Sequence, residues 1–74
     1  MIPRGQIIGR LREENYSLSK HGTRTEVLRQ HGTAQHVTVP LRDSFTPDEA
    51  KLILRQAGCT PAQIDRFLAD CLKG

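Results

Sequence analysis

The clearest pattern in the chain is an alternation of apolar and polar side chains in residues 35–41. Val37, Val39 and Leu41 occupy every second position of this run. Alternate side chains of a strand lie on the same face of its sheet, so the run predicts a strand with one buried face. Pro40 cannot donate a ladder hydrogen bond, and we expect it to end the strand or to lie at a sheet edge.

Two earlier segments also predict strands. Residues 16–20 alternate apolar and polar side chains, with Leu18 at an apolar position. Residues 24–30 form the second segment, and their pattern leaves open whether Val27 or Leu28 faces the core. A His-Gly-Thr sequence, which favours a turn, separates each segment from the next. The three segments therefore predict an antiparallel meander.

A helix is expected to precede the strands, over residues 3–14. Pro3 suits the first helical position, where its missing N–H costs nothing. Ile7, Ile8 and Leu11 form a short apolar stripe along one side of this segment, as in a helix that packs on a core.

Two more helices are predicted after the strands, and each begins at a strong local signal. Thr-Pro-Asp-Glu at residues 46–49 and Thr-Pro-Ala-Gln at residues 60–63 both match a capping box with proline at the first helical position. Gly58 is expected to end the first of these helices. Their buried positions are predicted to be Ala50, Ile53, Leu54, Ala57, Ile64, Phe67, Leu68 and Cys71.

The element order is α-β-β-β-α-α, which predicts an α+β fold. With 74 residues the chain is expected to form one domain, 1–74. We expect the helices to cover one face of the three-stranded antiparallel sheet, leaving the other face to solvent or a partner. A domain of this size has little room for a bulky cofactor, so none is predicted and function is expected on an exposed surface.

The charge distribution is uneven along the chain. The net charge is +3, but residues 1–42 carry seven basic and three acidic side chains, whereas residues 43–74 carry four basic and five acidic ones. A positive half suits a polyanion such as nucleic acid. An ordinary solvated surface of mixed charge is an equally good reading of the charge alone.

The two cysteines and the N-terminal segment bear on location. Cys59 and Cys71 match no zinc spacing and fall at apolar positions, so we interpret them as small buried thiols in a reducing compartment. No signal-peptide pattern opens the chain, and no apolar run approaches the roughly 20 residues that span a membrane. A cytoplasmic protein is therefore expected.

Three pieces of the sequence together resemble the HicA (YcfA-like) toxins of prokaryotic toxin–antitoxin systems. The first is the opening helix with an aromatic-led strand, IIGRLREENYSL. The second is a Gly-Ser/Thr turn after a basic residue, here Lys20-His21-Gly22-Thr23-Arg24. The third is HVTVP followed by a helix ending LILRQAG and a T-P-x-Q step. The resemblance covers about residues 3–65, and the last helix is longer than is usual in the family.

The resemblance implies a fold like the double-stranded-RNA-binding domain and the activity of an mRNA interferase, an endoribonuclease. It also implies messenger RNA and a HicB-type antitoxin as partners. The family's catalytic histidine follows the Gly-Ser/Thr turn directly or after one residue. Those positions are Arg24 and Thr25 in this chain, and neither is histidine.

This departure changes which residues are candidates for catalysis. RNA cleavage needs a base for the 2′-OH, and a histidine with an unperturbed pKa of about 6.5 can serve. Arginine stays protonated but can pair with phosphate. His21, three residues before Arg24, is therefore the candidate base, or else an exposed turn histidine. The candidate RNA-binding residues are Lys20, Thr23, Arg24, Arg29 and Arg42.

The other two histidines are interpreted as surface residues. His31 falls in the second turn, and His36 lies on the strand face opposite Val37 and Val39. The three histidines have no metal-ligand spacing with any cysteine or carboxylate, so no metal site is predicted.

Three hypotheses for function remain open. The first is a HicA-like toxin that cleaves RNA, and the second is a catalytically inactive module of the same fold that binds RNA or a protein partner. The third is a DNA-binding helix-turn-helix built from residues 46–72, where two capped helices meet at Gly58. The acidic balance of that half disfavours the third hypothesis.

Overall fold

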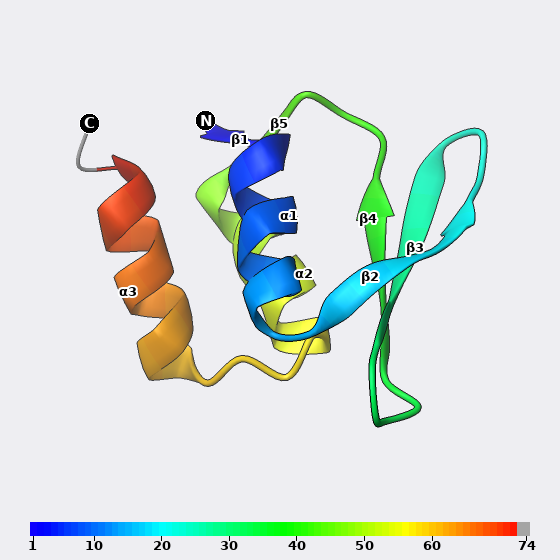
Figure 1. The fold of residues 1–74 in the computed structure, drawn as a ribbon. Coiled ribbons are helices and arrows are strands. Elements are labelled where there is room, and N and C mark those ends of the chain that lie inside the picture. The colour runs from blue at the N-terminus through cyan, green and yellow to red at the C-terminus, as the bar shows by residue number, and fades with distance from the viewer. Residues whose placement is uncertain (73–74) are drawn as a thin grey trace.

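The computed structural model describes residues 1–72 and has an α+β fold with three helices, a three-stranded antiparallel sheet and a two-stranded one (Figure 1). In chain order the elements are β1 (Ile2–Pro3), α1 (Arg4–Glu13), β2 (Tyr16–His21), β3 (Thr25–Gln30), β4 (His36–Pro40), β5 (Ser44–Phe45), α2 (Pro47–Gln56) and α3 (Pro61–Leu72).

The main sheet is an antiparallel meander in the order β2-β3-β4, as the three strand patterns predict. Leu28 lies directly opposite Val37 and is buried, which resolves the choice between Val27 and Leu28. Pro40 is the last residue of the edge strand β4, where its missing N–H breaks no internal ladder bond.

The helices lie on one side of this sheet. Figure 1 shows α1 and α2 between the sheet and α3, so that α3 packs on the other helices rather than on the strands. The core fills the space between these layers. Its largest fully buried side chains are Phe45, Ile2, Ile7, Leu11, Leu54, Val37 and Val39. Within residues 1–72, no helix covers the opposite face of the sheet.

Two short strands are missing from the sequence prediction. Ile2 pairs with Phe45 and Pro3 with Ser44, in a two-stranded sheet that ties the N-terminus to the segment before α2. Pro3 is therefore the N-cap of α1 in extended conformation, and its expected place inside the helix is wrong by one residue. Ile2 and Phe45 are both fully buried, and their burial favours the pairing.

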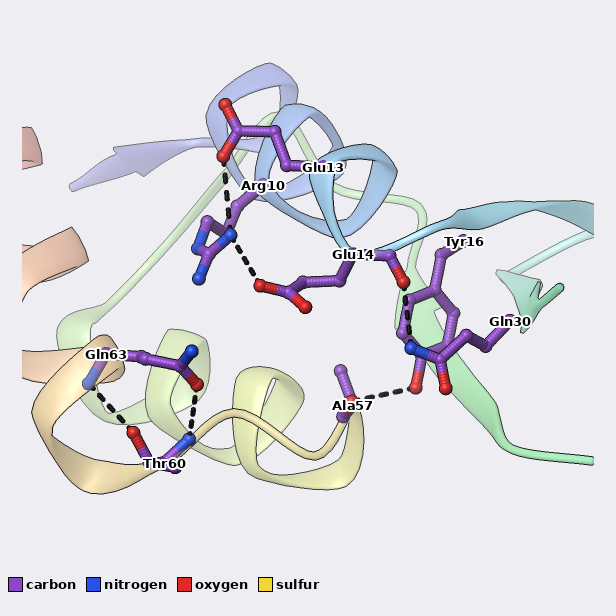
Figure 2. Close-up of polar contacts among 8 residues, drawn as sticks. All are labelled: Arg10, Glu13, Glu14, Tyr16, Gln30, Ala57, Thr60 and Gln63. Atoms are coloured by element: carbon purple, nitrogen blue, oxygen red, sulfur yellow. Dashed lines mark hydrogen bonds and ion pairs between the residues drawn. The ribbon is translucent and has the colours of Figure 1, made fainter. Parts of the chain in front are cut away.

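The predicted starts of the two later helices are confirmed, as is the end of the first at Gly58, whereas the expected end of the last helix at Lys73 lies outside the described residues. Thr46 forms a full capping box with Glu49, and Thr60 and Gln63 exchange the same pair of bonds at the start of α3 (Figure 2). Gly58 has a φ of 88°, the left-handed conformation expected after a helix end. Six of the eight apolar positions predicted for these helices are buried, and the other two, in α3, are half-buried.

Two apolar side chains expected in the core are exposed instead. Leu18 is 56% exposed, because α1 ends before the chain enters β2 and covers only the first residue of that strand. Leu41 is 37% exposed, because β4 ends at Pro40 and Leu41 belongs to the connection that follows.

Polar contacts fix the junction where β2 and β3 meet the helices (Figure 2). The Tyr16 hydroxyl donates a buried hydrogen bond of 2.8 Å to the carbonyl oxygen of Ala57. The Gln30 side-chain amide donates to the carbonyl oxygen of Glu14 at 2.8 Å, and the Glu14 carboxylate pairs with Arg10 at 2.8 Å. Within residues 1–72, no helix has both the length and the apolar composition to cross a membrane.

Candidate functional site

The end of the β2–β3 hairpin holds the candidate catalytic residues. β2 extends one residue further than predicted, so His21 is a strand residue directly opposite Glu26 on β3. The turn between them closes through the Gly22 N–H, which donates to the Thr25 carbonyl oxygen at 2.9 Å. A Cβ on Gly22 would lie 3.0 Å from that oxygen, so glycine is what permits this tight closure.

Three elements contribute to one chain of polar contacts at this end. Nδ1 of His21 lies 3.0 Å from Oε2 of Glu26, and the guanidinium of Arg4, the first residue of α1, donates to Oε1 of the same carboxylate. The Glu26 side chain is 15% exposed, whereas the His21 side chain is 64% exposed. The carboxylate is thus enclosed, and the imidazole beyond it is open to solvent.

The contacts of Glu26 determine how His21 is held. The hydrogen bond from His21, followed by the bond and charge of Arg4, lowers the pKa of the Glu26 carboxyl below its ordinary value of 4.5, against an opposing effect of desolvation. An ionised carboxylate only accepts hydrogen bonds, so Nδ1 of His21 must carry the hydrogen. When the ring is neutral, Nε2 then has the free lone pair.

Arg4 positions this carboxylate from the helix side. Its backbone N–H donates to the Asp43 carbonyl oxygen at 2.8 Å, next to the pairing of β1 with β5. Its Nε is buried and has no hydrogen-bond partner among residues 1–72, so the ion pair with Glu26 is the principal compensation for partly burying this side chain. The pair joins α1 to the hairpin across 22 positions of sequence.

The structure brings three of the predicted RNA-binding residues together. Lys20, Thr23 and Arg24 are all exposed at the end of the β2–β3 hairpin. The Leu41 N–H donates to the Arg24 carbonyl oxygen at 2.9 Å, which fixes the turn beside the end of β4. Neither Lys20 nor Arg24 forms an ion pair with any other residue in 1–72.

Arg42 lies at the same end of the sheet but is already engaged. Its guanidinium pairs with Glu49, and it stacks 4.9 Å from the centre of the Phe45 ring. The Glu49 carboxylate also accepts the Thr46 N–H, and this backbone bond, followed by the bond to Arg42, lowers its pKa. Arg42 therefore serves mainly to stabilise the start of α2.

Arg29 is separate from the other predicted RNA-binding residues. It lies opposite His36, four residues along β3 from Thr25, or roughly 13 Å at the usual rise of a strand. It is exposed and makes no ion pair with residues 1–72. The predicted set therefore divides between the two ends of the sheet.

The positions that match the family's histidine do not coincide with His21. Thr25 lies opposite Pro40 on the uncovered face of the sheet, whereas His21 lies opposite Glu26 on the helix-facing side. Arg24 is in the turn between them. A proton-transfer site at His21 would therefore be a different site from one at Thr25, reached from the other face.

Sequence reasoning missed Glu26 and Arg4. Glu26 had a usable signal, because a tight turn after His21 places the two residues opposite each other on a hairpin. Arg4 had none, since its approach to Glu26 depends on how α1 packs on the sheet. Among residues 1–72, no group of three or more His, Cys, Asp or Glu side chains is arranged to hold a metal ion.

Comparisons of the chain with protein-family models, with curated proteins and with solved structures gave no match. The HicA resemblance therefore stays a prediction drawn from the residues themselves.

Proposed function

We propose that this chain is a HicA-like RNA-binding domain, of the double-stranded-RNA-binding-domain kind, that cleaves RNA with His21 as the general base. The observation that carries the proposal is the contact between Nδ1 of His21 and the ionised Glu26. It leaves Nε2 of an exposed imidazole free to take a proton, at a hairpin end with two cations, Lys20 on β2 and Arg24 in the turn, that form no ion pair within residues 1–72.

The reaction that suits this arrangement is transesterification at an RNA phosphate. Nε2 of His21 takes the proton of a 2′-OH, the 2′ oxygen bonds to the neighbouring phosphorus, and the bond from phosphorus to the 5′ oxygen breaks. The leaving 5′ oxygen takes a proton from water, and His21 returns its proton to solvent. The products are a 2′,3′-cyclic phosphate and a 5′-hydroxyl.

Glu26 and these two cations have distinct roles in this reaction. Glu26 is a positioning residue, since it orients the ring and stabilises the imidazolium that forms when His21 is protonated. Lys20 and Arg24 attract the phosphate backbone, and the Arg24 guanidinium can pair with two phosphate oxygens at once. A HicB-type antitoxin is the protein partner proposed with this function.

The second candidate is an RNA- or partner-binding module without cleavage. One observation favours it: Arg4 also pairs with Glu26, so the carboxylate serves to join α1 to the hairpin whether or not His21 reacts. In that case Lys20 and Arg24 bind RNA and His21 contributes only to the hairpin end.

Cleavage assays separate the two candidates. A mixed messenger RNA substrate is incubated at pH 7 with the wild-type protein and with His21→Gln and Arg66→Gln, the last a control on the exposed side of α3. The proposal predicts cyclic-phosphate ends with wild type and the control, and a loss of about 100-fold or more with His21→Gln. RNA binding without cleavage by the wild type would establish the second candidate.

A further inference from the structure

An open depression lies at the end of the sheet opposite the His21 site, where β2 and β3 meet the turn that follows β3. The ends of β2 and β3 and the turn that follows β3 form its lining, which includes Ser17, Ser19, Arg29 and His31. Among the described residues, no acidic side chain lines it. It is therefore a hollow with hydrogen-bonding groups and positive charge.

Four functional groups lie at or beside this depression: Ser17, Arg29 and His31 line it, and His36 on β4 lies next to Arg29. Ser17, Arg29 and His36 occupy directly opposed positions on β2, β3 and β4, so they form one row across the sheet. Opposed side chains of antiparallel strands have Cβ atoms about 5 Å apart. Nε2 of His31 lies 2.9 Å from Oγ of Ser17, which brings the second imidazole to the same row.

The charge of this row is not compensated within residues 1–72. Arg29 makes no ion pair with the described residues, and its register neighbours are a serine and a histidine. The helix-facing side of the same strand differs, since Glu26 lies there and is paired with Arg4. A guanidinium, two imidazoles and a hydroxyl together suit a tetrahedral oxyanion, because all carry N–H or O–H donors, one of which is used in the Ser17–His31 hydrogen bond.

We infer that Ser17, Arg29, His31 and His36 form a phosphate-binding site. Arg29 pairs with two phosphate oxygens, and the Ser17 hydroxyl and the His36 ring donate to the others, while Nε2–H of His31 donates to Oγ of Ser17 and orients that hydroxyl. Phosphate is favoured over a carboxylate because it offers more acceptor oxygens to this set of donors. The identification of the phosphate as one of RNA rests on the proposed function, but phosphate binding itself does not.

The site would give RNA a second point of attachment. His21 lies on the helix side of the sheet and the Arg29 row lies on the uncovered side, and each includes a residue of the edge strand β2. An RNA strand can contact both by passing around the β2 edge. No Phe, Tyr or Trp side chain belongs to the row, so we expect phosphate contacts to contribute more to binding here than base stacking does.

Histidine ring signals in NMR spectra test the inference directly. Inorganic phosphate, the dinucleotide ApA and tetraglutamate are titrated separately into the full chain, with sodium chloride at matched ionic strength as the reference. We expect phosphate and ApA to shift the His31 and His36 ring signals saturably, to the same extent in the wild-type protein and in His21→Gln. The relative affinity of phosphate and ApA then tells whether a terminal monoester or a backbone diester is the preferred ligand.

Variants make the test specific. Arg29→Ala should weaken phosphate binding at least tenfold and Arg29→Lys should weaken it less, whereas Arg55→Ala, an exposed control on α2, should leave it unchanged. His21→Gln should also leave it unchanged, so that failure of the RNase proposal does not affect this result. Unmoved His31 and His36 signals, or undiminished binding by Arg29→Ala, would overturn the inference. Tighter binding of tetraglutamate than of either phosphate compound would overturn it in favour of an acidic protein segment.

Discussion

The Tyr16 hydroxyl donates a hydrogen bond to the carbonyl oxygen of Ala57, 41 residues away in the sequence, and so joins the first residue of β2 to the end of α2. Both groups are buried. Burial, followed by the charges of Cys59 and Glu14, raises the pKa of this phenol above its ordinary value of 10.0.

Replacement of this phenol should therefore be measurable at neutral and at alkaline pH. Tyr16→Phe leaves the Ala57 carbonyl oxygen without its partner and should lower the free energy of unfolding by about 1–3 kcal/mol at pH 7. Because the folded-state pKa is raised, the wild-type protein should lose stability as pH rises above about 10, when the unfolded chain releases the proton more readily. Chemical denaturation across this pH range checks both points. An equally steep alkaline loss in Tyr16→Phe would contradict the assignment.

The Arg4–Glu26–His21 contacts predict a dependence of stability on acid. The pKa of Glu26 is lowered in the folded state, so its contribution is present above the ordinary value of 4.5 and is lost as pH falls below it. Glu26→Gln should therefore flatten the fall in the free energy of unfolding between about pH 5 and pH 2. Glu13→Gln, at an exposed position of α1, is the matched control and should retain more of the wild-type slope. Identical slopes in the two variants would show that Glu26 is not the group responsible.

Two glycines should respond oppositely to the same substitution. Gly9 lies within α1, and a Cβ added there would meet no neighbouring atom within 4 Å, so Gly9→Ala should stabilise the protein by about 0.5–1 kcal/mol. Gly58 has a φ of 88°, which strains any other residue, so Gly58→Ala should destabilise it by about 1–2 kcal/mol. Thermal unfolding of the two variants gives the comparison. A destabilising Gly9→Ala would mean that α1 packs more tightly at this point than the structure indicates.

The features of the fold that could be predicted from the sequence are those that depend on contacts between residues close together in the chain. The capping boxes of α2 and α3 were predictable because each joins residues only three positions apart. The pairing of Ile2 with Phe45 was not, because two-residue strands have no periodicity and exist only through the core they close. Leu18 was misplaced because alternation says which side of a strand a residue takes, but not how far a helix extends over it.

The candidate site divides in the same way. His21, Lys20 and Arg24 were evident as residue types, and Glu26, which was missed, could have been inferred from hairpin geometry once the turn was known. The contact of Arg4 with Glu26 could not be predicted, because it depends on how α1 packs against a hairpin 22 residues away. The ion pair of Arg42 with Glu49 could not be predicted either, because it depends on where α2 begins. Prediction of the row formed by Ser17, Arg29 and His36 would have needed the exact register of the three strands.

The contrast between Arg24 and Arg42 gives a test of RNA binding. Arg24 is unpaired among the described residues, whereas Arg42 is held by Glu49 and the Phe45 ring. Arg24→Ala should reduce the slope of log affinity against log salt concentration by about 0.7, the value for one lost contact to single-stranded RNA. Arg42→Ala should change the slope little. Fluorescence anisotropy of labelled RNA over a salt series measures both, and equal effects of the two variants would contradict the division.

The role of His21 depends on Glu26 holding the hydrogen on Nδ1 and leaving Nε2 free. The most direct test is long-range nitrogen NMR of the His21 ring above about pH 8, where an ordinary histidine is neutral. The wild-type protein should show the Nδ1–H tautomer, and Glu26→Ala should shift the ring toward the Nε2–H tautomer that a free imidazole prefers. An Nε2–H ring in the wild type, or the same tautomer in both proteins, would contradict His21 as a carboxylate-oriented base.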